Sequence, residues 1–549
     1  MIATLLCLAL HGAPAVTAAA TAAGPESDVI LDAMKDELAR AAQLKLANTP
    51  APYWASYQVV DVEAVLVSAK FGALVNSSAS RSRALAPRLR VGDLQLDAVG
   101  VPISDEPLVG YEADYDALRH ALWRYTDGAY KMAATQYRRE VAQKAQTTAD
   151  PDRPSSFTTA PPVISIAKPL PANVDRKALE ALARRVSAVF REHDHILDNA
   201  VSLSFSAVER RFVSTDGAAV LDGSAIIAMT IDASTQATDG DMIGRRKTHL
   251  FRPGELPDAA VLEADATQIA KDLLALRTAP LVRDYSGPLL FEPEAAGDLF
   301  ASVMSTQLVA SGNWNGEVDG KFGQLVLPKG VDVVDDPIAT QFEGKPLLGT
   351  LGVDDEGVQA ERVQLIRDGK LVGLLAGRAP GKKVKRSNGH GRSAPYGMDV
   401  RPGTTNLIIS AKTGLSAAAM EKKLLALVRE RGAEFGIIIS GADSHGGVTA
   451  YRLDKDGKRE LVRVGYLQGL EFRQLREVVA LGKTRVVRHG MQMGGQPMPV
   501  GAMPPTMAGF VSPMSVVAPA ILLRDAELHA FVGDNPKPPA YPRPTFSKR

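Results

Sequence analysis

VQAERVQLIRDGKLVGLLAGR, residues 358–378, carries two runs that contain apolar residues, and the pair Asp368-Gly369 lies between them. An Asp-Gly pair between two such runs favours a tight hairpin turn, so this stretch predicts two antiparallel strands. A second stretch at residues 449–467, TAYRLDKDGKRELVRVGYL, has its own Asp-Gly pair and predicts another hairpin. The two hairpins indicate an antiparallel sheet in this half of the chain.

Helices and further strands are predicted around the two hairpins. A helix is expected directly after Leu290, where an apolar run meets the sequence PEAAGD. The later predicted elements are a basic glycine-containing loop (381–397), a strand (406–411), a helix (416–431), a strand (436–441), a methionine-rich loop (491–513) and an apolar run (516–530).

The first half shows the same mixture of helices and antiparallel strands. Residues 53–99 alternate and are rich in valine and tyrosine, which predicts consecutive strands with a turn near Phe71-Gly72. Residues 200–236 predict a second pair of strands, with a turn at Thr215-Asp216-Gly217. Helices are predicted at 26–46, with Ser27 or Asp28 as the N-cap, and at 112–147, 176–192 and 257–276.

The length of 549 residues exceeds one ordinary hydrophobic core, so at least two domains are expected. We expect an N-terminal α+β domain at 24–280, which contains a connection rich in Pro, Ser and Thr at 148–175. A C-terminal α+β domain is expected at 281–535, followed by a proline-rich tail at 536–549. Because neither half shows regular strand–helix–strand alternation, the predicted fold is α+β, with antiparallel sheets and flanking helices in both halves.

The composition excludes some classes of partner. The formal net charge is +1 and charged residues make up 23% of the chain, so no overall field favours nucleic acid or an anionic membrane. After residue 25 no stretch is long and apolar enough to span a bilayer. We therefore expect neither a nucleic-acid partner nor a transmembrane segment.

The first 23 residues resemble a secretory signal peptide, because an apolar run leads into small residues that offer cleavage sites near Ala18–Ala23. This favours an exported protein of the periplasm or cell envelope; a cytoplasmic protein is the alternative if the start is misassigned. Cys7 is the only cysteine in the chain. Removal of the leader would leave neither disulfides nor thiolate ligands.

Ordered motifs along the chain resemble the TldD/PmbA family, a group of metallopeptidase-related proteins also called the modulator of DNA gyrase family. In the second half these motifs are DDEGVQAERVQLIRDGKLVGLL, SNGHGR (387–392), RPGTTNLII (401–409), YRLDKDGKRELVRVGYLQGL and GQPMPVG (495–501). In the first half RRFVSTDGAAV (210–220) resembles a strand–turn–strand unit of the family. The resemblance covers most of residues 50–535 and implies the two-part α+β architecture of that family.

The resemblance also implies where a catalytic site would lie. Catalytic members carry H-E-x-x-x-H in the helix that here reads PEAAGD, with the two histidines as zinc ligands, the glutamate as general base and a cysteine from the C-terminal loop. Carried over to this chain, the ligand positions are Pro293 and Asp298, and the base position is Glu294. The cysteine position falls near Met491, beside His489 and Met493.

These replacements make the zinc site degenerate. Proline has no donor atom, and a thioether is a poor ligand for zinc. The chain is in this respect closer to the PmbA branch, whose members lack H-E-x-x-x-H and can pair with a catalytic subunit. The cofactor is therefore unknown: the resemblance implies zinc, but the standard ligands are absent.

The acids at the start of this helix have two interpretations. Glu294 and Asp298 are four residues apart and share one helix face, so Glu294 could serve as a base and Asp298 as a metal ligand. Alternatively, Glu292 and Glu294 stabilise the positive end of the helix and Pro293 suits its first turn. Carboxylates alone suit Mg²⁺, Mn²⁺ or Ca²⁺ better than Zn²⁺.

Candidate substrate-binding residues come from two motifs of the resemblance. In SNGHGR the glycines allow close approach of a ligand, and Arg392 could hold a carboxylate or a peptide carbonyl, with His390 beside it. Asn406 ends the arginine-to-asparagine motif and is included as a third candidate. The alternative is a loop shaped only by its glycines.

Other constellations favour structural explanations. His193 and His195 flank Asp194 and could hold a metal on a strand, but a solvated turn explains them as well. Ser444-His445 lacks the surroundings of a nucleophile elbow, so a flexible glycine loop is preferred. Soft methionine sulfurs at 491–507 could bind Cu(I), but packing of a loop over the core is the simpler explanation.

These observations predict a protein related to the metallopeptidases that binds or cleaves extended peptides. We expect a non-catalytic or altered-metal member that works as a homodimer or as a heterodimer with a catalytic TldD-type relative. Extended peptide would be held along a strand edge. The alternative is a non-enzymatic peptide-binding or scaffold protein of the cell envelope.

Overall fold

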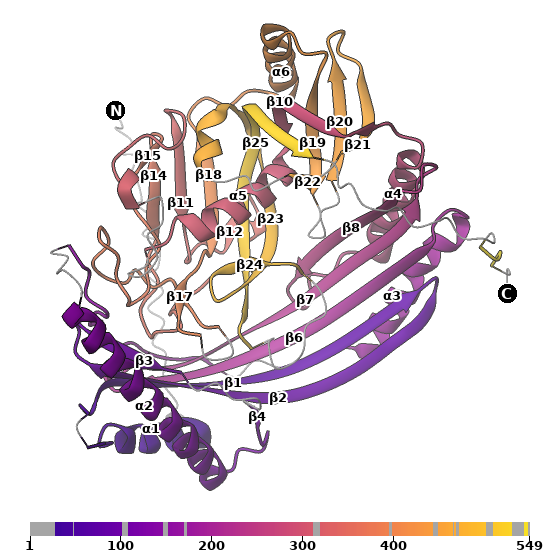
Figure 1. Cartoon of the computed structure of the whole chain (residues 1–549). Coiled ribbons are helices and arrows are strands. Elements are labelled where there is room, and N and C mark those ends of the chain that lie inside the picture. The colour runs from indigo at the N-terminus through magenta and orange to yellow at the C-terminus, as the bar shows by residue number, and fades with distance from the viewer. Residues whose placement is uncertain are drawn as a thin grey trace, which may run out of the picture.

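The computed structural model shows two units, a long curved sheet with helices and a second mixed unit on one face of that sheet (Figure 1). The residues that the structure describes are 28–47, 49–101, 108–146, 152–168, 173–310, 319–394, 398–442, 448–464, 466–467, 472–500, 509–529 and 543–546. The predicted signal peptide and Ser444-His445 lie outside them.

The curved sheet of the N-terminal unit is built from two long hairpins. Its strands are β1 (Pro52–Lys70), β2 (Ala73–Gly92), β3 (Asp97–Gly100), β4 (Leu108–Val109), β5 (Ile164–Ile166), β6 (Asp198–Ser214), β7 (Ala219–Gln236) and β8 (Met242–Phe251). Their order is β3-β2-β1-β6-β7-β5, with β8 also on β7. At the predicted turn, Phe71 and Gly72 both have positive φ, at 46° and 76°, as a two-residue hairpin turn requires.

Four helices cover this sheet: α1 (Val29–Ala41), α2 (Tyr115–Gln146), α3 (Arg176–Ala188) and α4 (Ala259–Leu276). A short 3₁₀ turn, η1 (Val189–Glu192), extends α3. α1 and α2 share one core with β1 and β2, whereas α3 and α4 share another with β6 and β7. Asp28 caps α1 by accepting the N–H groups of Ile30 and Leu31, so the second of the two predicted caps is the one used.

The proline-rich connection contains more structure than a surface loop. Its residues 164–166 form β5, which adds to β7 in parallel. Phe157 is 1% exposed and packs 4.9 Å from the ring centroid of Trp54. The connection is thus held on the sheet by the pairing of β5 with β7 and by the packing of Phe157 on Trp54. Its Pro, Ser and Thr content did not indicate either contact.

The C-terminal unit contains a mixed sheet with β25 at its centre and two separate two-stranded sheets, one within residues 341–346 and one within residues 391–402. Its strands are β9 (Leu281–Val282), β10 (Asp284–Phe291), β11 (Val331–Asp335), β12 (Gln341–Phe342), β13 (Lys345–Pro346), β14 (Val363–Arg367), β15 (Lys370–Leu371), β16 (Gly391–Arg392), β17 (Arg401–Pro402), β18 (Asn406–Ala411), β19 (Phe435–Ala442), β20 (Val448–Asp454), β21 (Arg459–Val464), β22 (Tyr466–Leu467), β23 (Val478–Met493), β24 (Gln496–Met498) and β25 (Val511–His529). β25 pairs with β18 in parallel and with β10 and β23 in antiparallel orientation. The predicted Asp-Gly hairpins are β14–β15 and β20–β21.

Two helices pack on opposite faces of this sheet: α5 (Pro293–Gln307) and α6 (Ala417–Arg431). Alternate residues of β10 explain the arrangement, because Leu289 and Phe291 face α5 whereas Leu290 faces α6. The short 3₁₀ turns are η2 (Asp319–Lys321) and η3 (Phe472–Glu477). The mixed α+β class expected from the sequence is confirmed.

The methionine-rich segment differs from its prediction as a loop. Met491–Met493 are the last residues of the long strand β23, and a turn at Gly494-Gly495 leads back into β24. Both glycines have positive φ, at 55° and 75°. The glycines and prolines marked the turn correctly, but the pairing of β23 with β25 is a long-range contact that a local pattern does not contain.

No described helix is both long enough and apolar enough to cross a membrane. From the tail, residues 543–546 lie against the N-terminal unit, where Nη1 of Arg543 donates to the carbonyl oxygen of Ile196 at 3.1 Å.

Candidate functional site

The acids at the start of α5 belong to the helix end. Pro293 is in its first turn, where the missing N–H costs no helical hydrogen bond. The carboxylate of Glu292, the N-cap residue, pairs with Arg459 at 3.0 Å. Glu294 is exposed, and the described part of the chain gives it no hydrogen bond or ion pair. Both acids lie where the positive end of the helix stabilises negative charge.

Asp298, one turn further along α5, binds a cation that the chain itself supplies. Nε of Arg488 on β23 donates to Oδ1 of Asp298 at 3.0 Å, and Nη2 lies 3.5 Å from Oδ2. Gly297 allows the strand to approach, because a Cβ on it would lie 3.1 Å from Cβ of Arg488. This fork-like geometry is the one in which guanidinium and carboxylate bind best.

Arg488 keeps its positive charge in this position. Desolvation by burial acts to lower its pKa, but the charges of Asp298 and Glu294 outweigh that effect and raise the pKa above the ordinary value. The side chain of Arg488 is still 28% exposed, so it is reachable from solvent. The face of α5 that resembles a zinc-binding helix is therefore covered by a guanidinium cation from β23.

The residues present do not fit a zinc ion. Pro293 has no donor atom, and Asp298 already binds Arg488. Met491 is three residues after Arg488 on a pleated strand, so its side chain points to the opposite face of the sheet. There it packs with Ile226, Ala228, Leu250, Leu348 and Val500. In the described parts of the chain no three His, Cys, Asp or Glu side chains are grouped as a metal would require.

His489 shares the face of Met491, away from α5. Its Nδ1 lies 3.0 Å from Oγ of Ser515, an oxygen that also accepts the N–H of Leu348 at 2.8 Å. Burial, followed by the nearby charges of Arg488 and Arg252, lowers the pKa of His489 to about 4. His489 is thus neutral at physiological pH and adds no charge to the site.

We expect His489 to remain unprotonated until the pH falls to about 4. Its pKa in the folded protein is lower than the ordinary value of about 6.5, so its contribution to stability is complete above about 6.5 and is lost as the pH falls through about 4. An NMR titration of the imidazole signals measures this directly, with the His489→Gln variant to assign the resonance. A midpoint near 6.5 would contradict the burial described above.

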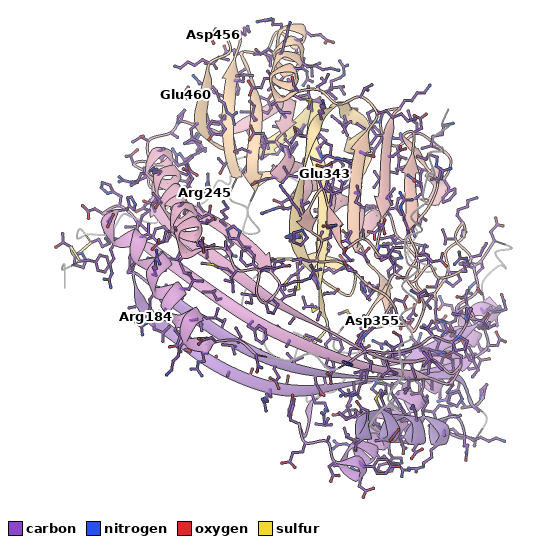
Figure 2. All side chains as sticks on the ribbon, turned by 180° about the vertical axis from the view of Figure 1, so that it is seen from behind. Arg184, Arg245, Glu343, Asp355, Asp456 and Glu460 are labelled. Carbon is purple, nitrogen blue, oxygen red and sulfur yellow. The ribbon has the colours of Figure 1, made fainter. Side chains whose placement is uncertain are left out.

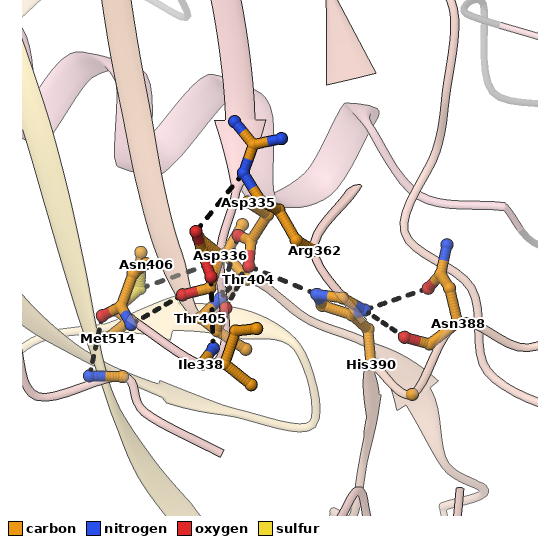
Figure 3. Close-up of polar contacts among 12 residues, drawn as sticks. Asp335, Asp336, Ile338, Arg362, Asn388, His390, Thr404, Thr405, Asn406 and Met514 are labelled. Atoms are coloured by element: carbon orange, nitrogen blue, oxygen red, sulfur yellow. Dashed lines mark hydrogen bonds and ion pairs between the residues drawn. The ribbon is translucent and has the colours of Figure 1, made fainter. Parts of the chain in front are cut away.

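His390, in the loop SNGHGR, is fully buried and its ring nitrogens are both engaged (Figure 3). Nδ1 lies 3.0 Å from the backbone oxygen of Asn388, and Nε2 lies 3.2 Å from Oδ1 of Asp335. Asp335 is also fully buried and accepts the N–H of Thr405 at 3.0 Å. His390 therefore ties the loop to β11 and to the segment before β18.

Asn406 performs a similar role in the same network (Figure 3). Its Oδ1 accepts the N–H of Gly349 at 3.0 Å, and its Nδ2 donates to the carbonyl oxygens of Asp336 and Ala339 at 2.9 and 3.0 Å. It is fully buried. The polar atoms of His390 and Asn406 are thus occupied by the protein, and a role of either residue in substrate binding stays a prediction.

Arg392 differs from these two neighbours. Only 4% of it is exposed, yet its guanidinium makes no hydrogen bond or ion pair with any described residue. Burial lowers its pKa in spite of the nearby Asp355 and Asp354. Oε1 of Gln492 is also buried and has no hydrogen-bond partner among the described residues. The side chains of Gln492 and Arg392 both lie against Gly403. Arg392 retains unused hydrogen-bonding capacity, and its assignment to substrate binding stays a prediction.

Charged side chains, most of them buried, join the two units, and Figure 2 shows Asp355 at this junction. We call this set the interface charge network. It consists of Arg88, Arg90 and Arg210 of the curved sheet and of Asp354, Asp355, Glu356, Arg378 and Asp399 of the C-terminal unit. Nη2 of Arg90 lies 2.7 Å from Asp399, and the guanidinium of Arg90 stacks 4.0 Å from the ring centroid of Phe157.

Arg210 is the central cation of the interface charge network. It pairs with Asp222 on β7 and with Asp355 across the interface, and its Nη2 donates to the carbonyl oxygen of Val353 at 2.9 Å. Although burial acts to lower its pKa, the two carboxylates raise it overall. Burial acts to raise the pKa of Asp355, but the charge of Arg210 contributes most to lowering it below the ordinary value.

Asp354 and Glu356 form a close pair of buried acids in the same network. Both lie near Gly391, where a Cβ would be 3.0 Å from Oδ2 of Asp354 and 2.9 Å from Oε2 of Glu356. Glu356 accepts the N–H of Arg378. Burial, with the charges of Asp354 and Asp399, raises the pKa of Glu356 to about 8, and burial also raises the pKa of Asp354. The pair therefore holds a proton at neutral pH.

Sequence reasoning singled out neither Arg488 nor these acids. The motif DDEG (354–357) entered the prediction only as part of a family motif, and no role was assigned to its three consecutive acids. Arg488 offered no local signal, because its partner Asp298 is 190 positions away.

The structure favours the structural interpretation of the histidines at 193 and 195 and of the basic loop, whereas Ser444-His445 lie outside the described residues. His193 is the C-cap residue of η1, and the two residues that follow form a turn. The lysines of the basic loop, Lys382, Lys383 and Lys385, are exposed.

Comparison with protein families identifies residues 285–529 as a PmbA/TldA metallopeptidase C-terminal domain. Two curated relatives are both named metalloprotease. The one from Methanothermobacter thermautotrophicus is 25% identical over 212 residues, which are 37% of this chain and 45% of that protein. The one from Archaeoglobus fulgidus is 35% identical over 81 residues, which are 15% and 17%. The chain thus matches less than half of the length of either relative.

Solved structures match over nearly the whole chain. TldE from Thermococcus kodakarensis superimposes with a TM-score of 0.59 and 15% identity, covering 91% of this chain and 100% of that one. A proposed modulator of a DNA gyrase from Thermotoga maritima gives 0.56 and 13%, with coverage of 90% and 99%. Another from Bacteroides thetaiotaomicron gives 0.52 and 12%, with coverage of 91% and 98%. At these identities the matches show a shared fold.

Proposed function

This chain is a metallopeptidase-related protein of the TldD/PmbA family, and from that premise we propose that it binds extended peptides without cleaving them. The observation that carries the proposal is the ion pair between Asp298 and Arg488. It uses the carboxylate at the second ligand position, while Pro293 leaves the first position without a donor. A zinc hydrolase needs its ligands and an open coordination position for water, and this helix supplies neither.

An open strand edge beside α5 supports the binding of extended peptide. β23 pairs with β25 on one side, and on the other side it pairs with β24 only from Met491 to Met493. Between Arg485 and Gly490 the described strands leave this second edge unpaired, and these residues are half-buried. Such an edge offers backbone N–H and C=O groups to an added strand.

We expect the protein, purified without a metal-binding tag, to contain no stoichiometric transition metal. The reason is the donor set: a proline, a carboxylate bound to arginine and a thioether on the far face of the sheet. Elemental mass spectrometry on the native protein measures this, and Asp298→Ala should leave the metal content unchanged. One metal ion per chain that is lost in Asp298→Ala would show instead that Asp298 is a ligand and would reopen catalysis by this chain.

The proposal includes assembly as a dimer, with a second copy or with a relative that carries H-E-x-x-x-H. In the second arrangement this chain shapes the peptide path and the partner cleaves. Co-purification from the native source, followed by a peptide-cleavage assay of the isolated chain and of the complex, tests this. Cleavage by the complex alone supports the arrangement, and cleavage by the isolated chain contradicts it.

The second candidate is a peptide-binding or scaffold protein of the cell envelope that takes part in no hydrolysis, alone or in any complex. It is favoured by the signal-peptide-like first 23 residues together with the degenerate helix. Cell fractionation discriminates the two, because an exported chain requires an exported catalytic partner. Export without any co-purifying peptidase would support the scaffold.

A further inference from the structure

The guanidinium of Arg488 occupies the face of α5 on which the metallopeptidase-like helix places its ligand positions. We propose that Arg488 serves as a built-in cation in place of a metal ion and binds the carbonyl oxygen of a main-chain amide in an extended peptide. This inference rests on the proposed function and names the chemical group that the site would hold.

The hydrogen bonds already made by Arg488 leave one edge of its guanidinium unused. The carboxylate of Asp298 accepts a hydrogen bond from Nε at 3.0 Å and lies 3.5 Å from Nη2. These two nitrogens form the side edge of the guanidinium. No described residue accepts a hydrogen bond from Nη1. A planar guanidinium held on its side edge by a carboxylate is fixed in orientation, and its end edge presents N–H groups in a defined direction.

Local charge selects a neutral ligand over an anionic one. Asp298 neutralises Arg488, and Glu294 adds a negative charge four residues earlier on the same helix face. A ligand carboxylate would be repelled by Glu294, whereas a peptide amide is uncharged. The exposed carboxylate of Glu294 can in addition accept an N–H, so Arg488 and Glu294 together offer a donor and an acceptor to one backbone.

The position of Arg488 also suits an added strand. It lies on β23 within the stretch whose second edge is unpaired in the described part of the sheet, and its side chain is 28% exposed. A peptide that pairs with that edge runs past the guanidinium. Unlike a bound metal, this cation is covalently fixed and cannot be removed by a chelator.

The test compares variants in a peptide-retention assay. The full chain is incubated with a tryptic digest of reduced and alkylated serum albumin, and retained peptides are quantified by mass spectrometry. We expect Arg488→Met to reduce retention at least about 10-fold, because a charge-assisted hydrogen bond is lost, and Arg488→Lys to reduce it less. Asp298→Asn should retain peptide, and EDTA should have no effect on the wild type.

Arg431→Met is the matched control. Arg431 is the last residue of α6, on the opposite face of the sheet from α5; its side chain is 38% exposed and it pairs with Asp525 at 2.6 Å, so its loss removes a similar surface cation away from the open edge. Retention should stay unchanged in this variant. Equal retention by wild type and Arg488→Met, or loss of retention in EDTA, would overturn the inference but not peptide binding. Failure of the wild type to retain any peptide would overturn the proposed function itself.

Discussion

Replacing Arg210 with methionine is expected to lower the free energy of unfolding by about 3–5 kcal/mol, the usual cost of removing one partner from a buried ion pair. Arg210 is 8% exposed and joins Asp222 on its own sheet to Asp355 of the other unit. Without it, the N–H of Ser393, at 2.7 Å, is the one hydrogen-bond donor that the described residues give to the carboxylate of Asp355. The two units would then be held together less tightly.

Chemical denaturation and differential scanning calorimetry measure this effect. Because Arg210 bridges the units, we expect the calorimetric transition of the variant to broaden or to separate into two. A second variant, Arg210→Met with Asp355→Asn, should recover part of the loss, since the uncompensated charge is removed.

A surface ion pair provides the control for Arg210. Lys70 and Asp198 are 43% and 57% exposed, so Lys70→Met should cost less than about 1 kcal/mol. A loss of similar size in Arg210→Met would show that the interface charge network contributes little to stability.

Replacing Glu356 with glutamine is expected to stabilise the protein at alkaline pH. The pKa of Glu356, raised to about 8 by burial and by Asp354 and Asp399, lies above the ordinary value of about 4.5. A raised pKa means that the folded protein holds a proton that the unfolded chain releases. The stability from this group is therefore complete below about 4.5 and is lost as the pH rises through about 8.

Glutamine retains an oxygen that can accept the N–H of Arg378 but does not titrate. We expect the variant to equal the wild type near pH 5 and to exceed it by about 4 kcal/mol at pH 9, since one pKa unit corresponds to about 1.4 kcal/mol. Unfolding curves at several pH values measure the difference. Glu361→Gln is the control, because Glu361 is 47% exposed and pairs with Arg386 at the surface. Parallel pH profiles of wild type and Glu356→Gln would contradict the shared proton.

Local patterns predicted most of the secondary structure correctly. The turns at Phe71-Gly72 and Asp368-Gly369 both have positive φ at the two central residues, a geometry that depends on short-range sterics. The loop prediction failed at 491–493 and 511–513, because these residues belong to β23 and β25, which are stabilised by pairing with each other rather than by their own residues. Sheet order likewise could not be read from hairpins, since β25, the last strand in the chain, lies between β18 and β10.

The candidate site was predicted only in part. The resemblance placed Pro293, Glu294 and Asp298 on one helix end, and the structure has them there. It did not predict Arg488, the cation that pairs with Asp298 and on which the proposed peptide contact depends. Nor did the sequence show that Met491 points away from α5, which follows from the register of β23.

The sequence by itself determined most of the helices and strands, the resemblance to the TldD/PmbA family and the absence of the zinc ligands, because turn residues, periodicity and donor atoms are properties of single or neighbouring positions. Only the tertiary structure decided which cation lies beside Asp298 and which charges pair between the two units. Asp298 meets Arg488, and Arg210 meets Asp355, across 190 and 145 positions of chain. Charges so far apart in sequence acquire their partners, their burial and their pKa values only when the strands that carry them pack together.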